Sequence, residues 1–408
     1  MSRVAITTFV VCSFASSAFA ADAEEETKTP ISNASEAATK TEPAKKTELV
    51  LTGWVEAFYQ WSIGRPSNRI TNFRGFDTRS ETFTLSNAVV DAAWSRDRMR
   101  GHLALQVGHT PETYYLAEPS LAGAAGAGES NFRVWKLLQQ ANIGWNAPIG
   151  RGLLFEAGLF LSPIGPEGMA VKDQWNWSRS NLFFGLPFYH TGARATYPLT
   201  EKLSATAHVY NGWNSLVDNN RFKSGAFSVT YNDPDKLLIQ VLYFGGVERP
   251  TAAAEGNAAR HLFDGYVQFT PTKRVSLMLH GDVGFENNHF GRSTWAAAAA
   301  YARVELASFL FVAIRGDRFH EKAASNAEGA ASSLFWPTAG SSGGVTSGTV
   351  TLDARPVDGV SIRLEVRHDQ GEVPMYFRGD VATDATTGAF LPNSKSQDTL
   401  TLGATTWF

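Results

Sequence analysis

Short and long connections alternate along most of the chain, and this alternation restricts the possible folds more than any other feature of the sequence. The short connections, rich in turn-forming and charged residues, span residues 95–98, 146–151, 198–202, 232–236, 271–274 and 355–359. The long connections span residues 63–79, 110–130, 163–187, 211–221, 246–260, 321–343 and 371–396. Outer-membrane β-barrels have short turns at one rim and long loops at the other, whereas a soluble β-sandwich or propeller has no reason to alternate in this way.

Between these connections the sequence has a hydrophobic period of two. In residues 360–367, valine, isoleucine and leucine alternate with serine, arginine and glutamate, which gives an extended strand one apolar and one polar face. About sixteen segments follow this pattern, each near the ~9–11 residues that a tilted strand needs to cross a bilayer. We therefore predict an all-β fold, a transmembrane antiparallel up-and-down β-barrel of about 16 strands.

Residues 295–310 are the one segment whose residue types favour a helix, because residues 296–300 are all alanine. A membrane-spanning helix needs about 20 apolar residues, and Arg303 and Glu305 interrupt this stretch. As a strand, the even-numbered residues 296–304 face lipid, while Tyr301, Arg303 and Glu305 face the inside. We predict a strand.

The N-terminus predicts an export signal followed by a tail. Arg3 precedes an apolar stretch at 4–14, which is too short for a membrane helix, and the small-residue sequence Ala-Phe-Ala at 18–20 fits a cleavage site. The next residues are mostly Ala, Glu, Lys, Thr and Ser, too few of them large and apolar to offset the entropy of ordering, with a short helix as the alternative. The predicted parts are a signal peptide at 1–20, a disordered periplasmic tail at 21–48 and a barrel domain at 49–408.

Composition excludes several other classes of protein. The net charge of −3 gives no basic field for nucleic acid. A hydrophobic content of 43% is too low for a bundle of membrane helices but fits a barrel, where lipid-facing residues alternate with polar ones. Cys12, the only cysteine, lies in the predicted signal, so no disulfide scaffold is expected. The sequence predicts no cofactor and no metal site.

Aromatic residues recur near the short connections, in the register of the apolar faces. They are Trp94, Trp145, Tyr197, Tyr231 and Phe269. This placement predicts an aromatic belt at the membrane–water boundary. The last strand alternates and ends in Phe408, which is typical of the signal that the barrel-insertion machinery reads; an ordinary C-terminal strand is the alternative.

Charged residues of both signs lie on the opposite faces of the strands. The candidates for the pore lining on strands are Glu56, Glu156, Arg194, Arg303, Glu305, Arg315, Asp317, Arg363, Glu365 and Arg367. A charge in the hydrocarbon costs about 2–4 kcal/mol at the midplane, so one charged face per strand predicts water on that face. The alternative, the solvated face of a soluble sheet, leaves the apolar faces without a covering layer. Because both signs are present, the sequence does not indicate whether the pore prefers anions or cations.

The connection at 163–187 is the best candidate for a constriction. It carries Glu167, Lys172, Asp173 and Arg179, and charges at a narrow point of a pore set its ion selectivity. The alternative is an external loop that contacts lipopolysaccharide or a neighbouring subunit.

Four motifs in this region carry a family resemblance. They are Pro-Ile-Gly-Pro-Glu at 163–167, Ser-Arg-Ser at 178–180, Pro-Phe-Tyr-His-Thr-Gly at 187–192 and Asn-Gly-Trp at 211–213. Residues 158–220 resemble the OmpL-like β-barrel porin family (the beta-barrel porin-2 type) in the order of these motifs, although Pro166 stands where that family usually has an aromatic residue. The resemblance implies a multi-pass porin in the outer membrane of a Gram-negative-type bacterium, without catalytic residues.

Three functions are open from the sequence. The first is a water-filled channel for passive diffusion of small hydrophilic solutes or ions, with membrane lipid, the insertion machinery and, by analogy with other porins, two further copies of the chain as partners. The second is a barrel enzyme, for which His190 and His289 are candidate bases, but no His-Glu-x-x-His motif is present. The third is a structural or adhesive barrel whose tail binds periplasmic partners.

Overall fold

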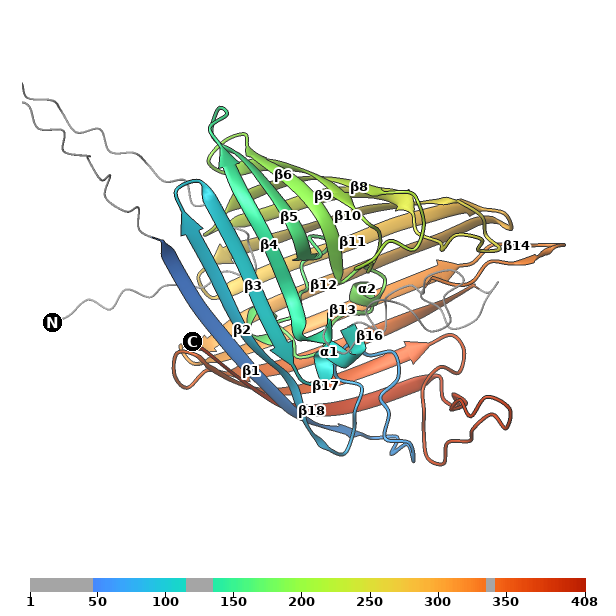
Figure 1. The fold of residues 1–408 in the computed structure, drawn as a ribbon. Helices are drawn as coiled ribbons and strands as arrows, with labels where there is room; N and C mark the ends of the chain where they lie inside the picture. Colours follow the sequence, from blue (N-terminus) through green and yellow to red (C-terminus); the bar gives the residue numbers. More distant parts are fainter. Residues whose placement is uncertain (1–46, 115–134, 335–341) are drawn as a thin grey trace, which may run out of the picture.

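The computed structural model describes residues 47–114, 135–334 and 342–408. Sixteen strands, each antiparallel to its neighbours, form a closed barrel in which β18 pairs with β1 (Figure 1). Their bounds are β1 Glu48–Ser62, β2 Phe83–Arg96, β3 Met99–Val107, β4 Leu138–Ala147, β5 Leu153–Leu161, β6 Tyr189–Pro198, β7 Leu203–Tyr210, β8 Ser224–Asp233, β9 Leu237–Val247, β10 Ala259–Thr272, β11 Val275–Asn288, β12 Gly291–Ala307, β13 Leu310–Lys322, β16 Ser342–Ala354, β17 Val360–Gly371 and β18 Ser396–Trp407.

Small elements lie in the loops. They are helix α1 (His109–Tyr114), the 3-10 helices η3 (Trp135–Leu137) and η4 (Val171–Asp173), helix α2 (Asn181–Phe184), and the hairpin of β14 (Ser325–Asn326) and β15 (Gly329–Ala330). No helix in these described ranges is long and apolar enough to cross a membrane.

The predicted strand number and antiparallel closure are confirmed. The alternation of link lengths has one exception, because β11 and β12 are joined by only residues 289–290 at the long-loop rim. The C-terminus and the short turns lie at the opposite rim (Figure 1). The predicted signal peptide and all but the last two residues of the predicted tail lie outside the described residues; the first strand begins at Glu48.

The alanine-rich segment is a strand, β12, as its interrupted hydrophobic pattern predicted. Ala296, Ala298 and Ala300 are exposed on the outer face, while Trp295 and Tyr301 are buried inside. Pairing with β11 and, from Thr294 on, with β13 gives most of its backbone groups partners, and this outweighs the helical propensity of alanine.

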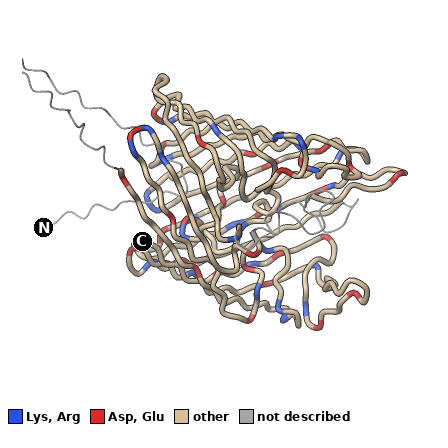
Figure 2. The backbone as a smooth tube through the Cα atoms, viewed as in Figure 1, with Lys and Arg blue, Asp and Glu red and all other residues tan. Residues whose placement is uncertain are grey.

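On the barrel strands, apolar side chains point outward and charged side chains point inward, which is the opposite of a soluble protein. On β17, Leu364 and Val366 point outward with 44% and 53% of their surface exposed, while Arg363 and Glu365 point inward and are 1% exposed. Charged residues of both signs are interleaved along the wall (Figure 2). Apolar side chains around the outside and polar ones inside fit a barrel surrounded by lipid.

Candidate functional site

Residues 162–188, which join β5 to β6 and which we call the inner loop, lie inside the barrel. Every residue from Gln174 to Leu182 is buried. The loop contains η4 and α2, and Ser180 caps α2 by accepting a hydrogen bond from the backbone N–H of Phe183. The buried backbone N–H and C=O groups of this loop need hydrogen-bond partners, and the barrel wall must supply them.

Wall carboxylates accept hydrogen bonds from backbone N–H groups of the inner loop. The pairs are Val171 to Glu56 at 2.6 Å, Trp177 to Glu365 at 2.6 Å, Ser178 to Glu365 at 3.0 Å and Asn181 to Asp317 at 3.0 Å. Hydrogen bonds to charged groups each contribute about 1.5–3 kcal/mol. Strands β1, β13 and β17 thus each hold one part of the loop.

Wall arginines bind the carbonyl groups of the same loop. Arg363 donates to the carbonyl oxygens of Val171 and Asn176 at 2.9 and 3.1 Å. Arg315 donates to the carbonyl of Ser178 at 2.5 Å, and Arg367 donates to the carbonyl of Arg179. The loop backbone therefore has carboxylates for its donors and guanidinium groups for its acceptors, and we call this set of contacts the loop clamp.

Two charged residues of the loop brace it from within. Arg179 donates to the carbonyl groups of Gly168, Met169 and Trp177. Glu167 accepts hydrogen bonds from the backbone and hydroxyl of Ser180 and forms an ion pair with Arg315 at 3.1 Å. Both residues belong to the motifs found in the sequence, and their contacts hold the bend of the loop.

The first long connection, residues 63–82, covers the inner loop from the long-loop rim. The ring of Phe76 packs against Phe183, with ring centroids 5.6 Å apart, and lies under the guanidinium of Arg179. Arg74 pairs with Asp77 at 2.6 Å and with Asp369 of β17 at 3.1 Å. Burial alone would raise the pKa of Asp77, but Arg74 beside it holds that pKa below its ordinary value.

The wall made by β3, β5 and β6 is not part of the loop clamp and keeps exposed charge. Glu156 lies between Arg100 and Arg194, at 2.5 and 2.6 Å. The side chain of Arg100 is 39% exposed, whereas that of Glu156 is 5% exposed. Two guanidinium groups around one covered carboxylate leave this wall with a net positive charge.

The inner loop presents a second pair of accessible charges. Lys172 and Asp173, in η4, pair at 2.9 Å, and their side chains are 24% and 22% exposed. The ammonium of Lys172 lies 5.4 Å from the ring centroid of Trp54 on β1. These charges and that of Arg100 are partly exposed.

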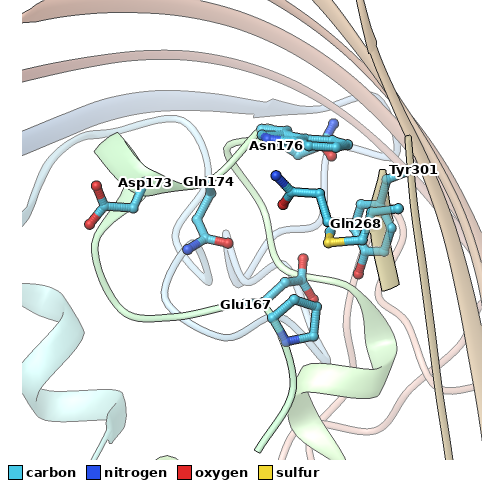
Figure 3. A pocket seen from close by; sticks show the side chains of 9 residues that line it. Glu167, Asp173, Gln174, Asn176, Gln268 and Tyr301 are labelled. Atoms are coloured by element: carbon cyan, nitrogen blue, oxygen red, sulfur yellow. The ribbon is translucent and has the colours of Figure 1, made fainter. Parts of the chain in front are cut away.

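A small pocket lies between the inner loop and strands β10–β12. Its lining includes Glu167, Asp173 and Gln174 from the loop and Gln268 and Tyr301 from the wall. Figure 3 shows the Gln174 side chain turned towards this space and the Asp173 carboxylate turned away from it. Pro166, Trp175 and Met278 add apolar surface to the lining, and its polar groups other than Glu167 and Asp173 are uncharged.

The structure divides the predicted pore-lining residues into two sets. The residues that form hydrogen bonds within or to the inner loop are Glu56, Glu167, Arg179, Arg315, Asp317, Arg363, Glu365 and Arg367. The other predicted residues are not part of the loop clamp. Lys172 and Asp173 lie in the inner loop itself, and the remaining ones lie on the wall strands: Glu156, Arg194, Arg303 and Glu305. Arg74 and Asp77 were not among the predicted residues, because nothing in the pattern of a long connection indicates which of its charges turn inward.

The predicted interface aromatics lie near the short-turn rim on the outer face. Trp94, Trp145, Phe269 and Phe408 are 39%, 45%, 46% and 73% exposed, and Tyr197 and Tyr231 are partly exposed. Trp145 stacks on Phe155 of the neighbouring strand with ring centroids 6.2 Å apart.

Comparison with known proteins identifies the family. The model of the family described as "Putative beta-barrel porin-2, OmpL-like" matches residues 48–408. The chain belongs to this family. It is a β-barrel porin, as the sequence motifs implied, and the match covers the whole barrel as well as the region of the motifs. No curated protein matches the sequence.

Solved porins share the fold of this porin. The outer-membrane channel DcaP of Acinetobacter baumannii is 11% identical, with a TM-score of 0.55 over 89% of this chain and 97% of that one. An anion-selective porin from Comamonas acidovorans is 10% identical, with a TM-score of 0.54 over 89% and 100%. OmpT of Vibrio cholerae is 10% identical, with a TM-score of 0.53 over 91% and 100%, and is also described in a trimer form. At these identities the likeness is one of fold alone.

Proposed function

We propose that this porin is a passive channel for small hydrophilic solutes or ions, and that the inner loop forms its constriction. The observation that carries the proposal is the loop clamp, which ties residues 171–181 to β1, β13 and β17. A sixteen-stranded barrel is wide enough to leave an aqueous channel, so a loop held against one part of the wall narrows the lumen without filling it. Solutes then pass between the loop and the Arg100 wall.

The accessible charges at this passage are mixed, with the more exposed ones positive. Arg100 and Lys172 keep more surface than Glu156, which is covered by its two arginine partners. Charges at a constriction act strongly because a narrow, low-dielectric surrounding focuses their field. We propose that Arg100, Arg194, Glu156, Lys172 and Asp173 set the ion preference of the channel.

We also propose that the barrel lies in the outer membrane of a Gram-negative-type bacterium, with its aromatic rim at a membrane–water boundary. The apolar outer face and the Trp94, Trp145 and Phe269 side chains near the short turns support this placement. Assembly as a homotrimer has support from the trimer form of the similarly folded OmpT. Insertion through the terminal Phe408 strand remains a prediction from sequence.

A barrel enzyme is the alternative, and its candidate bases are poorly placed. His190 is buried between Ser162 and the carbonyl of Gly212, and it stacks on Tyr210. His289 pairs with Glu328 on the surface at 2.6 Å. A Gly-x-Ser-x-Gly pattern occurs at 340–344, but Ser342 begins strand β16 instead of occupying the sharp strand-to-helix turn that exposes a nucleophile. We propose that the porin has no catalytic activity.

Planar-bilayer recording of the purified porin tests the proposed function. We expect discrete, ohmic conductance steps, and liposomes containing the porin should swell in small sugars but not in large polysaccharides. Membranes that stay silent at several voltages, with folded porin inserted, contradict a channel. Hydrolysis of lipid or peptide that disappears in His190→Gln or His289→Gln favours the enzyme.

A further inference from the structure

Asp264, His280 and Asp282 form a buried cluster on the inner faces of β10 and β11. Asp264 and Asp282 lie opposite each other in the register of the two strands, and His280 is two residues from Asp282. One oxygen or nitrogen atom from each of the three side chains lies within 4.8 Å of the other two. The three residues are 5%, 4% and 2% exposed. The cluster lies on other strands than the clamp contacts of β1, β13 and β17.

Asp282 is the unexplained member of the cluster. Both of its carboxylate oxygens are buried, and among the described residues no cationic side chain donates a hydrogen bond of ordinary geometry to them. The indole of Trp295 acts on this carboxylate but carries no positive charge to balance it. The charged side chains that act on it are His280 and Asp264. A carboxylate withdrawn from water needs a partner of opposite charge or a proton.

The surroundings of His280 add to the negative charge. Its Nε2 lies 2.7 Å from Asp264 Oδ2, and the carboxylates of Asp282 and Glu167 also act on it. Its other ring nitrogen, Nδ1, is buried and has no hydrogen-bond partner in the part of the chain that the structure describes. Three carboxylates around one imidazole give a site that attracts a cation.

We propose that Asp264, His280 and Asp282 bind a divalent transition-metal ion. One imidazole nitrogen and two carboxylate oxygens are a donor set that Zn²⁺ accepts, with bonds of about 2.0–2.2 Å and a fourth position left for water. Neutral imidazole favours transition metals over Mg²⁺ and Ca²⁺, which prefer oxygen ligands alone. The charge of the ion neutralises the two aspartates.

The three side chains must shift to accept the ion. Two ligands of a tetrahedral Zn²⁺ are about 3.3 Å apart, so His280 Nε2 and Asp264 Oδ2, now 2.7 Å apart, must separate by about 0.6 Å. Asp264 Oδ1 accepts the backbone N–H of Gly165 at 3.1 Å, and such an outer hydrogen bond orients a ligating carboxylate. Through this contact the ion connects the wall to the first turn of the inner loop.

Zinc binding to the folded, tag-free porin tests the proposal. Protein stripped with a chelator is dialysed against Zn²⁺, freed of excess metal and analysed by elemental mass spectrometry. We expect one Zn²⁺ per barrel, and an affinity at least about 100-fold lower in Asp282→Asn and His280→Gln. The control is His289→Gln, which removes an exposed histidine paired with Glu328 and should leave both stoichiometry and affinity unchanged.

Two results overturn the proposal. One is that the wild-type barrel retains no more Zn²⁺ than a chelator-treated blank. In that case Asp282 carries a proton instead of binding a metal ion. The other is that Asp282→Asn binds Zn²⁺ as the wild type does, which places the metal on the surface. If both variants fail to fold, zinc-edge X-ray absorption of the wild-type porin decides: one imidazole with oxygen donors supports the site, and two or more imidazoles contradict it.

Discussion

The carboxylate of Glu365, on β17, accepts the backbone N–H of Trp177 at 2.6 Å, although the two residues are 188 positions apart in the chain. The same carboxylate accepts the next N–H, from Ser178, at 3.0 Å. Both residues are buried. A charged acceptor on the wall has thus replaced water as the partner of two loop donors, and this exchange holds the inner loop inside the barrel.

Glu365→Gln should weaken the loop clamp. The amide keeps one acceptor oxygen but loses the charge, and its NH₂ group cannot accept from the second N–H. We expect the free energy of unfolding in urea to fall by about 1–3 kcal/mol and the open-channel current to become noisier. Glu372→Gln is the matched control, because Glu372 pairs with Arg318 on the exposed surface. Equal effects of the two variants would contradict a clamping role for Glu365.

Arg100→Gln and Glu156→Gln should move the ion preference in opposite directions. The first change removes the exposed positive charge of Arg100. The second removes the carboxylate of Glu156 and leaves the positive charges of Arg100 and Arg194 without their partner. In a salt gradient, the reversal potential should shift towards cations for the first variant and towards anions for the second. Arg318→Gln, on the outer surface, should cause no shift. Shifts of the same sign in the first two variants would exclude this wall from the conducting path.

The layout of the barrel follows from the sequence, but the course of the inner loop does not. Period-two segments and the lengths of the links predict strands, faces and rims, because both are local properties. The pattern that places Arg315, Arg363 and Arg367 on the inner face is the same whether they meet water or a loop. Their loop partners are 137 to 192 positions away, and no local pattern records such a contact.

Long-range contacts also explain why the inward position of Arg74 was not predicted. Arg74 meets Asp369 across 295 positions, and its own connection has no periodicity that tells an inward charge from an outward one. Glu167 and Arg179 were predicted as charges of a constriction and as members of recurring motifs, but the sequence did not indicate their partners. Their contacts give a physical reason for those motifs, since one accepts from the N-cap of α2 and the other binds three loop carbonyls.

Acid should loosen the first long connection. Arg74 holds the pKa of Asp77 below its ordinary value of 3.8, so the folded state favours the ionised carboxylate. The stabilisation from this pair is complete above about pH 3.8 and is lost as the pH falls below that value through the folded pKa. The wild type should therefore be more stable than Asp77→Asn at pH 6, and the difference should shrink at pH 3 in urea unfolding. A difference that grows in acid would contradict this sign.

Gly403→Val should displace Trp177. A β-carbon at Gly403 of β18 would meet the indole ring of Trp177, which also packs on Phe58 with ring centroids 5.8 Å apart. We expect a loss of about 1–3 kcal/mol in stability from overpacking and a changed single-channel conductance. Gly348→Val is the control, because nothing lies within 4 Å of the β-carbon it would add. Unchanged conductance in Gly403→Val would place Trp177 away from the constriction.

Chemical modification of a single cysteine in the inner loop tests whether this loop constricts the channel. Lys172→Cys, in a Cys12→Ser background, is treated during single-channel recording with a bulky, charged methanethiosulfonate. Thr387→Cys, in the exposed connection before β18, serves as the control. We expect the current through Lys172→Cys to fall by about half or more and the control current to stay unchanged. Complete labelling of Lys172→Cys with an unaltered current would contradict it.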